Sequence, residues 1–76
     1  MTIRTDHDVI SALEALMEAM EGQLLSTASM RPFFAVGEWL LCFEGAWILA
    51  KDDPDHPLRR VAAYRELETY FAEYLI

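Results

Sequence analysis

Cysteine is nearly absent from this chain of 76 residues, and long apolar runs are missing altogether. The single cysteine, Cys42, has no second thiol with which to form an internal disulfide, which fits a reducing cytosol. Strictly apolar runs such as Trp39–Phe43 fall far short of the roughly 20 residues that cross a bilayer. Residues 1–8 hold no apolar stretch of the kind found in a secretory leader. We therefore predict a cytoplasmic protein that does not interact with membranes.

Basic residues are also scarce, and they are unevenly placed. The chain has 6 Lys and Arg against 13 Asp and Glu, a formal net charge of −7, and no basic residue lies between Arg4 and Arg31 or between Arg31 and Lys51. Residues 1–50 hold two basic and seven acidic residues, a balance of −5, whereas residues 51–76 hold four and six, a balance of −2. Such a field repels nucleic acid and anionic membranes and attracts basic proteins, although it also serves solubility.

The N-terminal third of the chain has the periodicity of a helix. Apolar residues recur at intervals of three and four from Asp6 or Asp8 to about Leu24, which predicts one amphipathic helix with a buried stripe. The stripe comprises Val9, Ile10, Leu13, Leu16, Met17, Met20 and Leu24. Thr5 and Asp8 have the spacing of a capping box, with Asp in place of the usual Glu or Gln.

A polar break separates this helix from the next segment. The small polar residues of Ser26–Ser29 favour turns and caps, and Ser29 is placed to cap a new helical turn. Pro32 is tolerated in that turn because first-turn N–H groups have no helical partner. We predict a short helix over Met30–Val36. Gly37 either ends this helix or lies within one longer helix.

The segment 38–51 is apolar around most of a helical circumference. On a helical wheel, Leu41 and Ile48 lie nearly opposite the main apolar face, and Glu44 with Lys51 marks a narrow polar strip. The main face comprises Trp39, Phe43, Ala46, Trp47 and Ala50. A bundle of this size has little chain with which to enclose such a helix, so we expect one apolar flank to form an interface. The two tryptophans suit either a core or a binding surface, with Trp47 favoured for the core.

The last third of the chain predicts a turn and one further helix. Lys51–Pro57 has the composition of a turn, and Pro57 suits the first position of a helix that is capped by Asp55 or His56 and extends to Tyr74. The predicted buried stripe comprises Leu58, Val61, Ala62, Leu67, Tyr70, Phe71 and Tyr74. No segment shows the alternation of a β-strand. We predict a single all-α domain over residues 1–76, a small bundle of three long helices plus one short helix.

Residues that carry catalysis or bind metals are isolated in this sequence. His7, Cys42 and His56 do not cluster, and Cys42 among apolar neighbours predicts an inert thiol. The carboxylates of Asp52–Asp55 resemble the start of a calcium loop, but prolines interrupt it and no Glu occupies the twelfth position. We interpret them as a solvated capping turn. Without a phosphate-binding glycine loop, the sequence predicts a protein that is not an enzyme and has no cofactor or metal.

The segment Val36–Glu44 and the helix that follows resemble the small helical immunity proteins of the MafI type. In that family a short helix is followed by Gly-Glu, an apolar helix with Glu six residues on, a turn and a last helix. Gly37, Glu38 and Glu44 match this pattern, and the first helix, ending around Leu25, fits it in position and length. The resemblance covers most of the chain. It implies a protein that protects a bacterium from a polymorphic or contact-dependent-inhibition toxin.

The resemblance also implies how such a protein acts. Many of these toxins are basic nucleases, so an acidic protein would be steered onto the nucleic-acid groove, where its carboxylates stand in for phosphates. Glu14 and Glu18 lie one helical turn apart with no basic residue nearby in the helix, a repulsion of about 0.2–0.5 kcal/mol that suggests a basic partner. Trp39 and Trp47 replace the smaller or aliphatic residues expected for the family, so its binding mode does not transfer directly.

These observations lead to two hypotheses about function. The first is an immunity protein that covers the active site or a neighbouring surface of a cognate, basic toxin domain. Its predicted partner-binding residues are Glu14, Glu18, Glu21, Glu38, Trp39, Phe43, Glu44, Asp52 and Asp53. The second is a small secretion chaperone or adaptor that forms a homodimer through the helix at 38–51.

Overall fold

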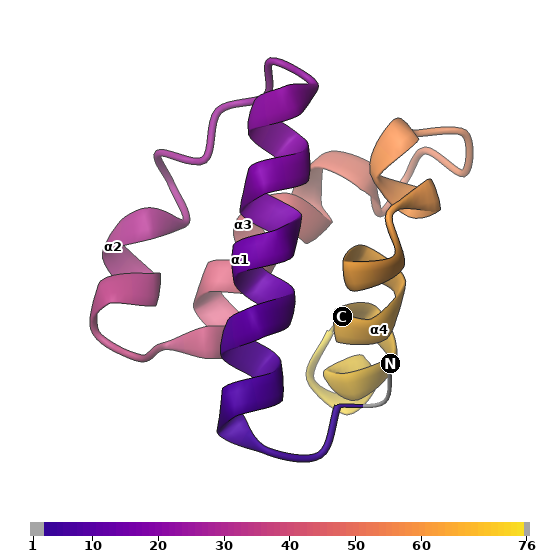
Figure 1. Cartoon of the computed structure of the whole chain (residues 1–76). Coiled ribbons are helices and arrows are strands. Elements are labelled where there is room, and N and C mark those ends of the chain that lie inside the picture. Colours follow the sequence, from indigo (N-terminus) through magenta and orange to yellow (C-terminus); the bar gives the residue numbers. More distant parts are fainter. Residues whose placement is uncertain (1–2, 76) are drawn as a thin grey trace.

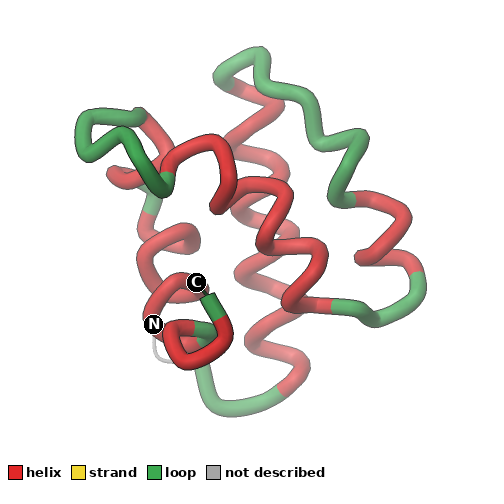
Figure 2. The backbone as a smooth tube through the Cα atoms, turned by 180° about the vertical axis from the view of Figure 1, so that it is seen from behind, coloured by secondary structure: helices red, strands yellow, loops and turns green. Residues whose placement is uncertain are grey.

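Helices alone form the secondary structure of residues 3–75, the part of the chain that the computed structural model describes. The elements are α1 (Asp6–Gly22), α2 (Arg31–Ala35), α3 (Trp39–Ala50), the 3-10 helix η1 (Pro57–Arg60), α4 (Ala62–Tyr70) and the 3-10 helix η2 (Ala72–Tyr74). The all-α prediction is thereby confirmed. Helix α1 packs against both α3 and α4, while α2 lies to one side and packs on α3 (Figure 1). Seen from behind, α3 lies in front of α1 (Figure 2).

Helix α1 begins where the sequence predicts. The Thr5 hydroxyl accepts a hydrogen bond from the Asp8 N–H at 3.2 Å, and the Asp8 carboxylate accepts one from the Thr5 N–H at 3.3 Å. The predicted capping box is therefore present. A further hydrogen bond from the Arg4 N–H, together with those from Thr5, lowers the pKa of Asp8. The helix buries most of the predicted stripe against the rest of the bundle: Val9, Leu13, Leu16, Met17 and Met20.

Leu24 is an exception, because it is exposed rather than buried. Helix α1 ends at Gly22, and Leu24 follows it with a φ of 60° and 94% of its side chain exposed. The Leu25 N–H donates to Met20 O at 2.8 Å and the Leu24 N–H donates to Glu21 O at 3.1 Å, the hydrogen-bond pattern of a Schellman motif. The left-handed residue of this motif is usually glycine. Here an apolar side chain is held in a strained backbone conformation and in solvent.

The end of α2 shows the same motif with the residue that suits it. Gly37 has a φ of 77° and lies between α2 and α3, which settles that it ends the short helix. The Glu38 N–H donates to Phe33 O at 2.9 Å and the Gly37 N–H to Phe34 O at 3.2 Å. At the other end of α2 the cap is Met30, not Ser29, and it makes no side-chain capping hydrogen bond.

The two motifs predict opposite changes in stability when their left-handed residues are substituted. Leu24→Gly should raise the free energy of unfolding by about 1 kcal/mol, because it relieves a left-handed backbone and gives up almost no burial. Gly37→Ala should lower the free energy of unfolding by about 1 kcal/mol, because alanine is strained at the positive φ of this position. Steric clashes do not contribute, since a Cβ there would meet only Trp39 at ordinary distances. Urea denaturation of both variants measures the effect. Shifts of the same sign would contradict the assignment of strain to Leu24.

Helix α3 is the centre of the core. Its residues Cys42, Phe43, Ala46 and Ala50 are fully buried, and the Phe43 ring lies 5.4 Å from that of Tyr64 and 6.0 Å from that of Phe71, between ring centroids. Arg59 of η1 stabilises the C-terminal end of α3 and the turn after it, because its side chain donates hydrogen bonds to three backbone carbonyls. These bonds run from Nε to Ala50 O at 2.9 Å and Asp53 O at 2.8 Å, and from Nη2 to Lys51 O at 2.8 Å.

Gly45 allows the chain before α2 to approach α3 closely. A Cβ at this position would lie 2.7 Å from the Met30 Cγ, and Met30 is fully buried. Gly45→Ala should therefore destabilise the protein by about 1–3 kcal/mol despite the better helix propensity of alanine. Gly22→Ala is the matched control, because a Cβ there meets nothing within 4 Å and the change should be neutral or stabilising. Thermal melts that rank Gly45→Ala at or above the wild type would contradict the close packing.

The last third of the chain is not the single helix that we predicted from Pro57 to Tyr74. Val61 takes an extended conformation, with φ −77° and ψ 122°, and divides the segment into η1 and the 9-residue α4, so the third long helix of the predicted bundle is not confirmed. His56 caps η1, its Nδ1 accepting from the Leu58 N–H at 3.1 Å. The break shifts the helical phase, so that Tyr64 becomes fully buried while Tyr70 and Tyr74 are exposed.

Candidate partner-binding surface

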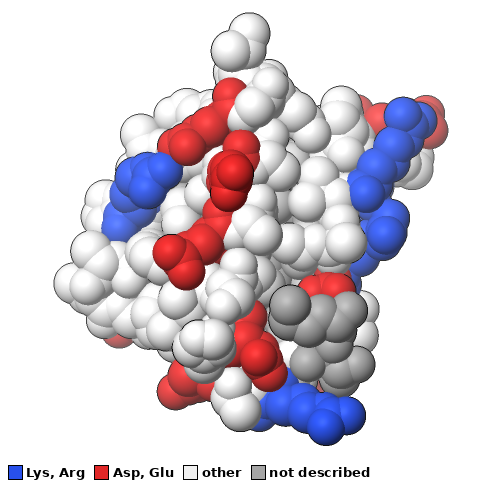
Figure 3. Space-filling view, in the orientation of Figure 1, with Lys and Arg blue, Asp and Glu red and all other residues white. Residues whose placement is uncertain are grey.

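An acidic ridge runs along the exposed side of α1. It is formed by Glu14, Glu18 and Glu21, which lie on successive turns of the helix and are all exposed. Figure 3 shows acidic side chains following α1 across the front of the molecule. The opposite side of the same helix carries the buried apolar stripe that packs on the core. The ridge therefore faces solvent. The structure thus brings together three of the nine predicted partner-binding residues.

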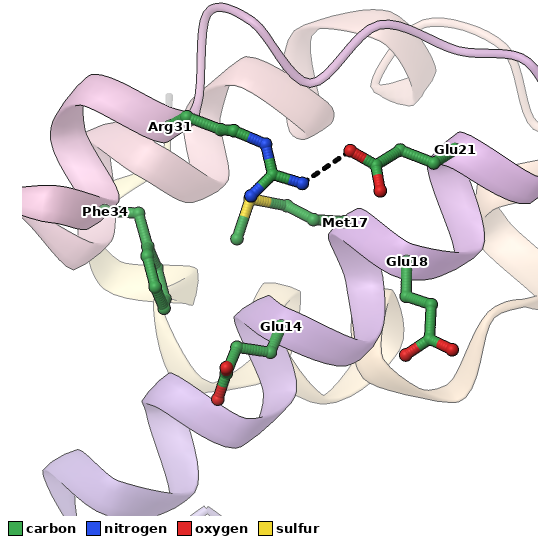
Figure 4. Close-up of a pocket in the computed structure, with 6 residues that line it drawn as sticks. All are labelled: Glu14, Met17, Glu18, Glu21, Arg31 and Phe34. Atoms are coloured by element: carbon green, nitrogen blue, oxygen red, sulfur yellow. Dashed lines mark hydrogen bonds and ion pairs between the residues drawn. The ribbon is translucent and has the colours of Figure 1, made fainter.

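A shallow groove of about 290 Å³ separates this ridge from α2. Its lining combines the ridge with Met17 of α1 and with Arg31 and Phe34 of α2 (Figure 4). Met17 is almost completely buried and Phe34 is half-buried. The groove therefore has an apolar part beside a row of carboxylates. We refer to it below as the α1–α2 groove.

Glu21 is the ridge residue that is already engaged within the chain. Arg31 forms an ion pair with it, and the Thr27 hydroxyl donates to the same carboxylate at 2.9 Å while accepting from Arg31 Nε at 3.2 Å. The hydrogen bond from Arg31, followed by that from Thr27, lowers the pKa of Glu21. These contacts among Glu21, Thr27 and Arg31 link the start of α2 to the end of α1. Within residues 3–75, Glu14 and Glu18 have no such hydrogen bond or ion pair.

The two aromatic residues predicted to contact a partner have different environments. Phe43 is fully buried in the core, so its assignment as a surface contact is wrong for this fold. Trp39 is half-buried, and its ring packs on Phe34 with a centroid distance of 5.6 Å and an interplanar angle of 57°. Trp39 does not line the groove itself but contacts Phe34, which does. Trp47 is also half-buried, with Lys51 Nζ 5.2 Å from its ring centroid.

The remaining predicted acidic residues do not line the α1–α2 groove. Glu38 is exposed at the start of α3 and Glu44 is half-buried within it, whereas Asp52 and Asp53 are exposed beyond its end. Because α3 spans roughly 18 Å, the two ends belong to separate parts of the surface. Asp53 also has a structural role, since its Oδ1 accepts from the Asp55 N–H at 3.0 Å within the turn.

Sequence reasoning missed Arg31, Phe34 and Met17 as parts of this surface. Arg31 is the only basic residue between Arg4 and Lys51, and this isolation was the one available signal. Its partner lies ten positions earlier, across a turn, and no helical spacing rule relates the two. Phe34 and Met17 carry no signal of their own, because apolar residues at helical spacing are the normal content of a core.

A second exposed surface lies on α3. Leu41 and Ile48 are 45% and 65% exposed, and they occupy the flank that the sequence placed opposite the main apolar face. Helix α1 is in front in Figure 1 and α3 is in front in Figure 2, which views the molecule from behind, so the acidic ridge and this flank belong to helices on opposite sides of the molecule. No helix among the described residues is long and apolar enough to cross a bilayer.

Cys42 should react slowly with thiol reagents. Its side chain is fully buried, and burial raises the pKa of the thiol from 9.0 to about 11. Because the thiolate is the reactive form, labelling at pH 8 should be at least about 100-fold slower in native buffer than in denaturant, where the thiol is solvated. Timed labelling followed by mass spectrometry measures both rates. Similar rates in the two conditions would place Cys42 outside the core.

Comparison of the chain with protein-family models, curated proteins and solved structures gave no match.

Proposed function

We propose that this protein is an immunity protein that binds and neutralises a cognate bacterial toxin, a basic domain with nuclease activity, in the cytoplasm. The observation that supports this function best is the state of Glu14 and Glu18. Both carboxylates are exposed on consecutive turns of α1, and neither is paired within the described chain. Keeping two like charges together costs stability on a helix, and a basic partner would offset that cost.

An acidic ridge suits inhibition of a nuclease because it needs no chemistry of its own. The nucleic-acid groove of such an enzyme is positively charged, so an acidic protein is attracted to the surface that substrate must occupy. Charge complementarity raises the association rate, and apolar contacts beside the carboxylates slow dissociation. The α1–α2 groove supplies such a contact directly beside the ridge through the half-buried Phe34.

Co-expression with the neighbouring toxin gene tests this proposal. Cells that produce the toxic domain encoded beside this gene should survive when this protein is present, and they should die when it is replaced by an unrelated acidic helical protein. The two proteins should also purify together. A neighbouring product that is harmless by itself, or that does not associate with this protein, would overturn the proposal.

A second candidate function, a small dimeric secretion chaperone or adaptor, is favoured by the exposed flank of α3. Leu41 and Ile48 place two large aliphatic side chains on one side of the helix in solvent, and pairing with a second copy would cover them. Analytical ultracentrifugation over a range of concentrations tests this function. A dimer that is lost in Ile48→Glu supports it, and a monomer at every concentration would exclude it.

A further inference from the structure

We propose that the α1–α2 groove receives an arginine side chain of the partner protein. This inference rests on the proposed function, because it names the chemical group through which a basic toxin engages the acidic ridge. The occupant must combine a cationic head with an apolar stem, since the groove offers carboxylates along one side and apolar surface within it. Arginine and lysine both have that form.

The apolar part of the groove is suited to a long side-chain stem. Phe34 is half-buried and lines the groove, so a methylene chain lying along it would contact its ring, whereas Met17 is almost completely buried and adds little surface. The Phe34 ring packs on the ring of Trp39, which restricts its motion. The aromatic surface is therefore present before a partner binds, which lowers the entropic cost of ordering the contact.

The charged part of the groove has two free carboxylates. Figure 4 shows Arg31 directed toward Glu21 at one end of the groove, while Glu14 and Phe34 lie toward the other end. The ion pair neutralises Arg31, so the guanidinium that the protein itself supplies does not repel a second cation as strongly as a free one would. Glu14 and Glu18 remain for the incoming charge.

The combination favours arginine over lysine. A planar guanidinium has five N–H donors, so it can stack on the Phe34 ring while it donates to a carboxylate of the ridge. The lysine ammonium is more strongly hydrated and has three donors on a compact head, so it gives up more hydration and contacts the ring less well. The partner residue that enters the groove is accordingly an arginine that projects from a basic surface.

Nuclear magnetic resonance titration of the intact protein tests this assignment without the toxin. The probe is the capped peptide acetyl-Gly-Arg-Gly-amide, and the matched control is the same peptide with citrulline, which keeps the shape of arginine and removes its charge. The arginine peptide should bind with a dissociation constant in the millimolar range and shift the signals of Glu14, Met17, Glu18 and Phe34. The lysine peptide should bind several-fold more weakly, and the citrulline peptide should not saturate.

Substitutions in the groove separate site binding from general attraction. Glu14→Gln and Glu18→Gln should each weaken the arginine peptide about threefold or more, and Phe34→Leu should weaken it while keeping an apolar side chain in place. Glu73→Gln, an exposed acidic residue in η2, is the charge-matched control and should change nothing. The circular dichroism spectrum and melting temperature of each variant establish that it is folded.

Three results would overturn the arginine assignment. They are equal binding of the citrulline peptide, shifts spread over all acidic residues, and affinities that Glu14→Gln and Glu73→Gln change equally. If any of these is found while co-expression still protects cells from the toxin, only the assignment of the groove fails. If the peptide binds in the groove but co-expression gives no protection, the proposed function fails and the groove remains an arginine site.

Discussion

Reversing the charge of Glu14 and Glu18 together is expected to slow association with the proposed basic toxin by roughly tenfold or more and to weaken the complex by a larger factor. The double variant Glu14→Lys with Glu18→Lys changes the local charge by four units at the centre of the acidic ridge. Steering is lost first, and any carboxylate that meets a desolvated charge in the complex also loses that contact. Stopped-flow mixing at several salt concentrations measures the association rate directly.

The same double variant should leave the fold almost unchanged. Both side chains are exposed and have no ion pair within the described residues, so the melting temperature should stay within a few degrees of the wild type. Raising the salt concentration should slow association of the wild type and bring it toward the rate of the variant, because screening acts beyond about 8 Å at physiological ionic strength. Glu73→Lys controls for net charge. Equal losses in this control and in the ridge variant would show that position on α1 does not matter.

Replacing Phe43 by alanine is expected to remove most of the stability of the domain. Its ring is fully buried in contact with those of Tyr64 and Phe71, and truncation of a buried phenylalanine typically costs about 3–5 kcal/mol. Domains of this size have roughly 5–10 kcal/mol in total, so Phe43→Ala should be partly unfolded at 37 °C. Urea denaturation followed by circular dichroism gives the loss in unfolding free energy.

Ile48→Ala on the same helix is the matched comparison for Phe43→Ala. Ile48 is 65% exposed, so its truncation should change the unfolding free energy by no more than about 0.5 kcal/mol. The pair therefore separates the buried and exposed sides of α3. If Phe43→Ala kept nearly full stability but lost toxin binding, Phe43 would be a surface contact as the sequence first suggested.

The start of the first helix depends on neighbouring residues, whereas the division of the last third of the chain depends on tertiary packing. The start of α1 was predictable because Thr5 and Asp8 close a capping box within one turn. The break at Val61 was not, because Arg59 turns back to hold the end of α3 and no spacing rule describes that contact. For the same reason the burial of Tyr64 was missed: its phase in the sequence belongs to a helix that starts at Ala62 rather than at Pro57.

The candidate partner-binding surface was also predictable only in part. Gaps between basic residues indicated the acidic ridge, since charge is visible in the sequence wherever the chain folds. A helical wheel places Trp39 and Phe43 on one face, but it does not tell which of them meets the centre of the core. The structure buries Phe43 completely and leaves Trp39 at the edge, against Phe34. The α1–α2 groove was invisible because it depends on how α2 lies across a turn from α1.

The acidic ridge and the exposed flank of α3 belong to helices on opposite sides of the molecule, and this arrangement bears on stoichiometry. Two copies joined through Leu41 and Ile48 would pair through α3 and leave the acidic ridge of each α1 outside the contact, so that each ridge could bind its own partner. Such a pair is bivalent. Toward a toxin that is itself paired, or displayed in several copies, a bivalent inhibitor gains avidity from the high effective concentration of its second arm, without any additional contact at the groove.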